Sequence, residues 1–259
     1  MLIDTHCHLD AAEFDPDREF VVERAHEAGV EIMVVPAVER ANFGAVASVC
    51  REFPGCVPAY GIHPMHVDRA REEDLDALRD TLRREPAVAV GEIGLDFFVE
   101  PRDEQRQRFY FGEQLRIARE FGVPVLLHVR RAVDAILGEL RRTPVPGGIA
   151  HAFSGSRQQA EEFIKLGFKL GFGGAMTNSR ANRLRELAAT LPLESIVLET
   201  DAPDIPPEWL SRDGARGRNE PGELLRIAAV LAELRGMQVR DVVAATSENA
   251  RATLPRLIG

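Results

Sequence analysis

The chain alternates short apolar runs with longer amphipathic segments along nearly its whole length. Eight apolar runs have the length and composition of buried strands, and they span residues 2–6, 31–37, 57–62, 88–93, 124–129, 148–153, 169–173 and 196–200. Apolar residues recur at helical spacing in segments that include 18–28, 72–84, 105–121, 133–142, 158–166, 180–191, 221–235 and 239–254. Strands that alternate with helices predict parallel βα units, and eight such units in 259 residues predict an α/β fold of the TIM (β/α)8 barrel type.

Glycine and proline mark the ends of these segments. Gly29, Gly122 and Gly167 each follow a helical segment and precede an apolar run, as residues that cap helix C-termini do. Residues 201–222 are irregular and rich in proline, glycine and charge. They follow the last predicted strand, which places them on the C-terminal face where barrel enzymes keep their chemistry. No linker or low-complexity stretch divides the chain, so we expect residues 1–259 to form a single domain.

Six side chains of the kinds that bind metal ions stand at or just past the carboxyl ends of the predicted strands. They are His6, His8, Glu92, His128, His151 and Asp201. Burying an imidazole or a carboxylate after an apolar run is costly unless a partner or a metal compensates. The carboxyl ends of barrel strands meet at one face, so the six side chains are expected to lie together. The pattern predicts a hydrolase built around a metal centre.

The four histidines among these residues indicate a metal site more strongly together than any one of them does alone. His6 and His8 are two residues apart, so on an extended chain they share one face. Alone, this pair also fits a polar strand end hydrogen-bonded to loops, and a single histidine at a strand end is usually a satisfied core residue. His128 and His151 end successive predicted strands and would face the pair. Together the four histidines favour a metal site.

The two carboxylates suggest distinct roles. Glu92 is predicted to be buried, and no predicted strand supplies an obvious cation for it, whereas its two oxygens can bridge two metal ions. The flanking Gly91 and Gly94 would leave room beside the centre. Asp201 shares a face with Glu199 and is the candidate ligand and general base that takes a proton from metal-bound water. A plain loop cap is the structural alternative for Asp201.

Other side chains are candidates for substrate binding. His63 follows the third predicted strand and could hydrogen-bond an anionic substrate oxygen, or serve as a structural residue of a rigid turn. Arg130 and Arg131 follow His128, and Arg218 lies in the long loop; guanidinium forks suit phosphate, although surface cations are the usual alternative. Asp96 could orient a ligand or cap a loop.

Composition narrows the classes of protein. The formal net charge is -9 and the pI is about 5.4, so any nucleic-acid contact should be a local pocket rather than a wide basic stripe. The cysteines Cys7, Cys50 and Cys56 do not suggest a disulfide framework, which favours a reducing cytoplasm. No apolar run approaches the roughly 18 residues of a membrane helix, and no signal peptide is expected. A monomer without an obligate protein partner is expected.

Seven stretches of the chain, taken together, resemble the TatD-type metal-dependent deoxyribonucleases of the amidohydrolase superfamily. They are IDTHCHLD (3–10), GIHP (61–64), GEIGLDF (91–97), HVRRA (128–132), HAFSGS (151–156), LETDAPD (198–204) and RNEP (218–221). The resemblance runs from residue 1 to about residue 254. Many members carry Ser or Cys, then Arg, then Asp after the third metal histidine, whereas this chain has Val129, Arg130 and Arg131. The departure marks a sub-branch with His-x-Arg-Arg after the fifth strand.

The resemblance implies a TIM barrel with up to two divalent metal ions and hydrolysis of DNA phosphodiesters, often from the 3′ end of single strands. It implies one metal held by His6, His8, Glu92 and Asp201, and a second held by His128 and His151, with Glu92 bridging the two.

The leading hypothesis is therefore a two-metal deoxyribonuclease, a 3′-5′ exonuclease on single-stranded DNA that uses Zn, Mn or Mg. Asp201 would act as the base with Glu92 at the centre, while His63, Arg130 and Arg218 bind phosphate. The alternative is an amidohydrolase-type enzyme that cleaves a small ester, lactone or amide, which the acidic composition favours. A nucleic-acid-binding or scaffolding protein with a vestigial site is disfavoured, because no candidate ligand is missing.

Overall fold

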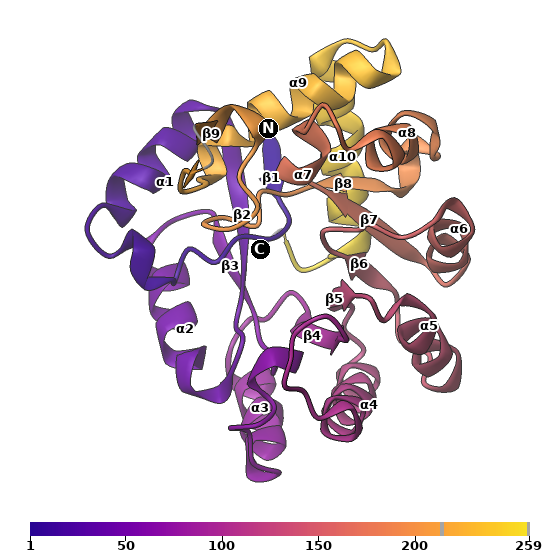
Figure 1. Ribbon diagram of the computed structural model, residues 1–259. Coiled ribbons are helices and arrows are strands. Elements are labelled where there is room, and N and C mark those ends of the chain that lie inside the picture. Colours follow the sequence, from indigo (N-terminus) through magenta and orange to yellow (C-terminus); the bar gives the residue numbers. More distant parts are fainter. Residues whose placement is uncertain (213–214, 258–259) are drawn as a thin grey trace.

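The computed structural model describes residues 1–212 and 215–257, and in them eight parallel strands line the middle of the molecule (Figure 1). The strands are β1 (Leu2–Asp4), β2 (Val30–Pro36), β3 (Cys56–Ala59), β4 (Val90–Asp96), β5 (Val125–Arg130), β6 (Gly148–Ala150), β7 (Phe168–Phe172) and β8 (Ile196–Leu198). All eight predicted strands are present.

Helices surround the strands on the outside (Figure 1). They are α1 (Arg18–Glu27), α2 (Phe43–Glu52), α3 (Glu73–Arg84), α4 (Glu104–Phe121), α5 (Val133–Arg142), α6 (Arg157–Lys165), α7 (Gly174–Thr177), α8 (Asn182–Thr190), α9 (Leu224–Arg235) and α10 (Val239–Thr253). Local signals set their ends: α4 begins after Asp103, whose side chain accepts from the backbone of Arg106, and ends at Gly122 with φ 62°.

Backbone hydrogen bonds join two sheets into a barrel. One sheet has the order β1-β2-β3 and the other β4-β5-β6-β7-β8. A bridge between Tyr60 and Val90 connects β3 to β4. On the other side, the Thr5 N–H donates to the Leu198 carbonyl at 3.1 Å, which brings β1 beside β8. The ring of parallel strands confirms the predicted TIM barrel.

The inside of the barrel is apolar at one end and polar at the other. Its apolar layer is one cluster of buried side chains that includes Ile3, Val34, Ala59, Leu126, Ile149 and Val197. Ala250 and Leu254 at the end of α10, with Leu257, belong to the same cluster. The last helix therefore closes the floor of the barrel, and in Figure 1 it lies behind the strands.

Strand alternation turns this apolar floor into a polar rim. Side chains two residues apart on a strand point the same way. Leu126 lies in the floor layer, and His128 follows it on β5; Ile149 likewise precedes His151 beyond β6. The same step on β8 leads from Val197 to Glu199. The period of two thus places chemically active groups directly above a water-free layer.

Three details differ from the expectations. Strands β1, β3, β6 and β8 end two or three residues earlier than predicted, whereas β4 ends three residues later. Beyond β1 and β8 the chain bonds across the rim, as in the 2.8 Å bond from Asp201 N–H to the His6 carbonyl. Helix α2 was not predicted, because its β-branched and glycine content masks the helical period. The irregular loop carries a short hairpin of β9 (Ser211–Arg212) and β10 (Ala215–Arg216).

The glycines beside Glu92 have a different role from the one expected. A Cβ on Gly91 would lie 2.6 Å from the Leu126 Cβ, and a Cβ on Gly94, where φ is +151°, would lie 2.0 Å from the His128 carbonyl oxygen. Both glycines therefore let β4 approach β5 closely, rather than leave room beside the centre.

No helix within the described residues is long and apolar enough to cross a membrane.

Candidate metal centre

Four of the predicted ligands converge at the rim. His6 Nε2 lies 3.3 Å from His8 Nε2, 3.1 Å from Glu92 Oε2 and 3.6 Å from Asp201 Oδ1. His8 Nε2 lies 3.6 Å from the same glutamate oxygen and 3.7 Å from the same aspartate oxygen. His6 is fully buried, and the Glu92 side chain is 2% exposed. Both Nε2 atoms therefore face the same two carboxylate oxygens.

These spacings suit a metal ion better than a hydrogen-bond network. Ligand atoms about 2.0–2.1 Å from a tetrahedral ion lie about 3.3 Å from one another, which is the range found here. Each imidazole Nε2 carries at most one proton, yet each faces another imidazole nitrogen and two carboxylate oxygens. A cation among His6, His8 and Asp201, with Glu92 beside it, would satisfy these groups. The residues present thus fit a divalent ion.

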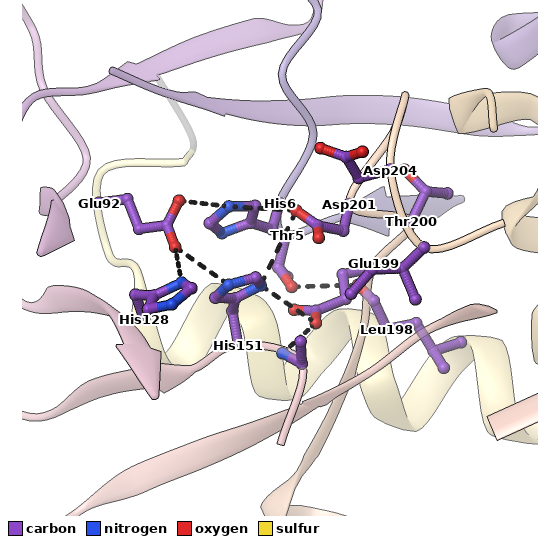
Figure 2. A network of polar contacts seen from close by, with 12 residues as sticks. Thr5, His6, Glu92, His128, His151, Leu198, Glu199, Thr200, Asp201 and Asp204 are labelled. Carbon is purple, nitrogen blue, oxygen red and sulfur yellow. Dashed lines mark hydrogen bonds and ion pairs between the residues drawn. The ribbon is translucent and has the colours of Figure 1, made fainter. Parts of the chain in front are cut away.

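Three more histidines surround the other oxygen of Glu92. Its Oε1 lies 3.0 Å from His128 Nδ1, 3.0 Å from His151 Nε2 and 3.4 Å from His63 Nε2. Figure 2 shows the Glu92 carboxylate between the rings of His6, His128 and His151. The two oxygens of Glu92 thus face two separate sets of nitrogens, and its role as a bridging ligand stays a prediction.

Asp96 sets the orientation of the His128 ring. Its Oδ2 lies 2.9 Å from His128 Nε2, while its Oδ1 accepts from the backbone N–H groups of Phe98 and Val99. Burial raises the pKa of Asp96, but hydrogen bonds led by His128 outweigh it and lower the pKa to about 2. An ionised carboxylate only accepts, so in a neutral ring that offers Nδ1 to a metal ion the proton lies on Nε2, where Asp96 accepts it. Without a cation, burial lowers the pKa of His128, but hydrogen bonds to Asp96 and Glu92 outweigh it and raise that pKa. Both sequence alternatives for Asp96, orienting group and loop cap, are present.

His63 has the opposite tautomer. Its Nδ1 accepts from the backbone N–H of Met65 at 3.1 Å, so the proton of the neutral ring is on Nε2. Burial lowers the pKa of His63 to about 4, which keeps the ring neutral near pH 7. The Nε2 atom therefore points a donor at Glu92 and into the cavity. This arrangement suits a hydrogen bond to an anionic oxygen better than a bond to a metal.

A buried carboxylate stands behind His151. Glu199 Oε1 lies 3.6 Å from His151 Nδ1 and accepts from the backbone N–H of Ala152. A Cβ on Gly171 would lie 2.1 Å from Glu199 Oε2, so only glycine leaves room for this carboxylate. The arrangement directs the Nε2 atom of His151 toward Glu92.

Asp4 and Asn219 fix the backbone around the centre. Asp4 Oδ1 accepts from the N–H groups of Thr200 at 2.9 Å and His6 at 3.2 Å, which ties the two segments that carry His6 and Asp201. The buried Asn219 amide donates to the Thr200 carbonyl at 2.7 Å. Sequence reasoning gave neither of them a role, although Asn219 lies in the RNEP stretch and Asp4 precedes the His6-x-His8 pair.

Electrostatics differ among the groups. Burial lowers the pKa of His6 to about 3, so its ring is neutral near pH 7. Burial raises the pKa of Asp201 to about 6. Burial alone would also raise the pKa of Glu92, but the histidines around it hold that pKa well below its usual range. Burial lowers the pKa of His128 and of His151, but the carboxylates around them outweigh it and raise both, so these two rings must release a proton to bind a metal ion. Neutral imidazole and ionised carboxylate are the forms that bind metal ions.

A cavity of about 790 Å³ opens above the centre. His8, His63, Glu92, Arg130 and Asp201 line it, together with residues such as Met65, Phe172 and Ile205. Its volume is within the range of ligand sites. Among the predicted phosphate-binding groups, His63 and Arg130 therefore lie at the cavity.

Arg218 does not line the cavity. Its guanidinium bonds both Asp17 oxygens at 2.7 Å and Glu220 Oε1 at 2.6 Å, and it stacks over Phe14. Two carboxylates already neutralise it, so the structure brings Arg218 into a clamp between α1 and the long loop rather than into the predicted phosphate site.

The barrel and its rim of histidines and carboxylates define a metal-dependent hydrolase of the barrel class. The chain matches the TatD related DNase family over residues 3–255, and it belongs to that family. The predicted family is thereby confirmed.

The chain is similar over nearly its whole length to relatives of nearly equal length. The uncharacterized metal-dependent hydrolase YjjV of Escherichia coli (strain K12) is 42% identical over 251 residues, which are 95% of each chain. The 3′-5′ ssDNA/RNA exonuclease TatD of Klebsiella pneumoniae (strain 342) is 35% identical over 254 residues, 96% of each. The crystal structure of the YjjV protein matches with a TM-score of 0.92 and 39% identity over 98% of each chain.

Proposed function

We propose that this protein is a two-metal phosphodiesterase that degrades single-stranded DNA from the 3′ end. The observation that carries the proposal is the position of Glu92, whose two oxygens face two separate sets of nitrogens at 3.0–3.6 Å. Two-metal sites of this kind suit in-line displacement at phosphorus. The relatives named as exonucleases support the substrate class.

In this proposal one metal ion is held by His6, His8, Asp201 and Glu92, and the other by His128, His151 and Glu92. When bound, the ions lower the pKa of a water molecule and neutralise charge on the phosphoryl oxygens. The mixture of imidazole and carboxylate suits Zn²⁺ or Mn²⁺, and Mg²⁺ supplied in excess is a further candidate.

The protein's own groups complete the reaction. Asp201, which lies at the cavity beside His6 and His8, accepts a proton from the attacking water. His63 donates a hydrogen bond from its Nε2–H to a non-bridging phosphate oxygen. Arg130, at the edge of the cavity, offers a guanidinium fork to the same phosphate group.

The test uses metal-stripped protein, Mn²⁺ or Mg²⁺, and single-stranded DNA and RNA oligonucleotides labelled at either end. Stepwise shortening from the 3′ end that needs the metal and is lost in Glu92→Gln supports the proposal. Asp80→Asn, at a surface ion pair with Arg83, serves as the matched control. Intact oligonucleotides with metal-loaded protein would contradict the proposal. A parallel panel of p-nitrophenyl esters and lactones would then identify the small-molecule hydrolase.

We also propose that residues 1–259 form a single metal-dependent hydrolase domain, because the first strand and the last helix share one buried cluster. A cytoplasmic location is proposed because Cys7, Cys50 and Cys56 are free thiols. The monomeric state stays a prediction.

A further inference from the structure

A second groove of about 700 Å³ begins where the metal cavity ends. The two share Val129, Arg130 and Ser154 as lining residues. The groove runs over the loop after β4 and the starts of α5 and α6, and Figure 1 shows β5, α5 and α6 side by side. A chain molecule with one residue in the metal cavity could therefore extend into this groove.

The groove gathers positive charge on an acidic protein. Arg130, Arg131 and Arg183 line it and are exposed, and Asp134 is the one carboxylate among its described lining residues. Asp134 accepts a hydrogen bond from Gln159 at 3.0 Å. No carboxylate of the described residues forms an ion pair with any of the three arginines, whereas Arg218, Arg24 and Arg69 each have such a partner.

An aromatic ring, rather than an acid, holds two of these arginines. The guanidinium carbons of Arg130 and Arg131 lie 4.0 Å and 4.6 Å from the centre of the Phe98 ring, which is 45% exposed. A guanidinium that stacks on an aromatic ring contacts the ring with its planar face. Its N–H donors lie at the edge of that plane and stay available for hydrogen bonds. The contact therefore positions two forks without consuming their donors, which suits them to bidentate binding of phosphate.

We infer that this groove, formed by Phe98, Arg130, Arg131 and Arg183, binds the phosphate next to the scissile one on a single-stranded substrate. Arg130 lies at the junction and contacts the scissile phosphate group, while Arg131 and Arg183 contact its neighbour. The inference rests on the proposed function. It explains how a protein with a net charge of -9 holds a polyanion, because attraction is confined to one short groove.

The test compares substrates with and without the neighbouring charge. We would measure kcat/KM on single-stranded oligothymidylate, on the same strand with a neutral methylphosphonate at the second linkage from the 3′ end, and on bis(p-nitrophenyl) phosphate. Arg131→Gln is expected to lower kcat/KM on the natural strand about 10-fold and to leave bis(p-nitrophenyl) phosphate unchanged. The methylphosphonate should lower kcat/KM of the wild-type protein by a similar factor. It should lower kcat/KM of Arg131→Gln little further, because that variant has already lost the contact.

Two variants serve as controls. Arg240→Gln, on a side chain that is 85% exposed on α10, should change none of the three rates. Arg131→Lys keeps the charge without the fork and should fall between the wild type and Arg131→Gln. The inference is overturned if Arg131→Gln has the wild-type kcat/KM on the natural strand. It is also overturned if the reductions in kcat/KM from the substitution and from the methylphosphonate multiply, because the two would then act independently.

The experiment distinguishes failure of the phosphodiesterase proposal from failure of the groove inference. If metal-loaded wild type cleaves neither the strand nor bis(p-nitrophenyl) phosphate, the phosphodiesterase proposal is wrong. The groove is then tested by fluorescence anisotropy of a labelled oligothymidylate. Binding at least about fivefold weaker in Arg131→Gln than in Arg240→Gln supports the groove as a phosphate site, and equal binding overturns it.

Discussion

Hydrogen bonds to backbone and carboxylate groups decide which nitrogen of each rim histidine faces Glu92. Asp96 accepts from His128 Nε2 and leaves Nδ1 as the nitrogen for a metal ion, whereas His63 accepts from Met65 at Nδ1 and so presents a proton. Two histidines on either side of Glu92 thus offer different groups at the nitrogen that faces it. No property of the amino-acid type distinguishes them, because the difference comes from the partner on the far side of each ring.

The tautomer of His128 can be tested through Asp96→Asn. The amide can turn its NH2 group toward Nε2, which moves the ring proton to Nδ1 and blocks the lone pair that faces Glu92. We expect the metal site at His128 and His151 to lose about 10–100-fold in affinity, while the site at His6 and His8 is retained. Calorimetric titration with Mn²⁺ would measure both sites. Equal loss at both, or at neither, would refute the assignment.

At the scale of elements, close backbone approach between β4 and β5 determines where Glu92 and His128 meet. Gly94 has φ +151° and lies against the His128 carbonyl. Gly94→Ala is therefore expected to destabilise the protein by about 3 kcal/mol or more, since both the backbone angle and the contact are unfavourable for a Cβ. Urea unfolding would measure the change.

The matched control for this variant lies on the next element. Gly112 is within α4, and a Cβ there would meet nothing within 4 Å. Gly112→Ala should stabilise the protein by roughly 0.5–1 kcal/mol. Similar losses in the free energy of unfolding for Gly94→Ala and Gly112→Ala would show that the close approach of β4 to β5 does not account for the effect at Gly94.

The clamp between α1 and the long loop predicts a pH dependence. The hydrogen bond from Arg218 lowers the pKa of Asp17, so the pair stabilises the fold above the ordinary value of 3.8 and is lost as pH falls through the lowered pKa. Asp17→Asn should therefore lower the Tm at neutral pH, with the difference from wild type vanishing well below pH 3.8. A difference that persisted in acid would contradict the charge mechanism.

Helices and strands were largely predictable from sequence, and the exceptions have physical causes. Continuous apolar runs identified the strands, because barrel strands are covered by helices outside and bury side chains such as Val34 and Leu126 inside. The β-branched and glycine content of α2 concealed it, although Phe43, Val46 and Val49 pack one face against the sheet. The grouping of the predicted ligands followed from strand order, but the pairing of Arg218 with Asp17 depends on residues 201 positions apart.

At the scale of the whole molecule, the residues that stabilise the barrel and the residues that form the candidate site lie at opposite ends of the strands. The floor layer closed by α10 holds the strands together, and the rim above it carries the ionisable groups. Leu254→Ala should cost about 2–5 kcal/mol of stability, because it removes a fully buried side chain from that floor. The folded variant should keep the metal affinity of the wild type.

Leu225→Ala provides the control for the floor variant. Leu225 is 41% exposed, so its loss should change stability by less than about 1 kcal/mol. Chemical unfolding and Mn²⁺ titration on the same samples would measure both properties. A drop in metal affinity for Leu254→Ala under folding conditions would show that floor and rim are coupled.

The central claim is that Glu92 joins two metal ions at one end of the barrel. The most direct measurement is anomalous diffraction from crystals of the protein grown with Mn²⁺. The account predicts two peaks roughly 3.5–4 Å apart, one beside His6, His8 and Asp201 and one beside His128 and His151, with Glu92 between them. A single peak, or peaks that leave Glu92 without a metal contact, would contradict it.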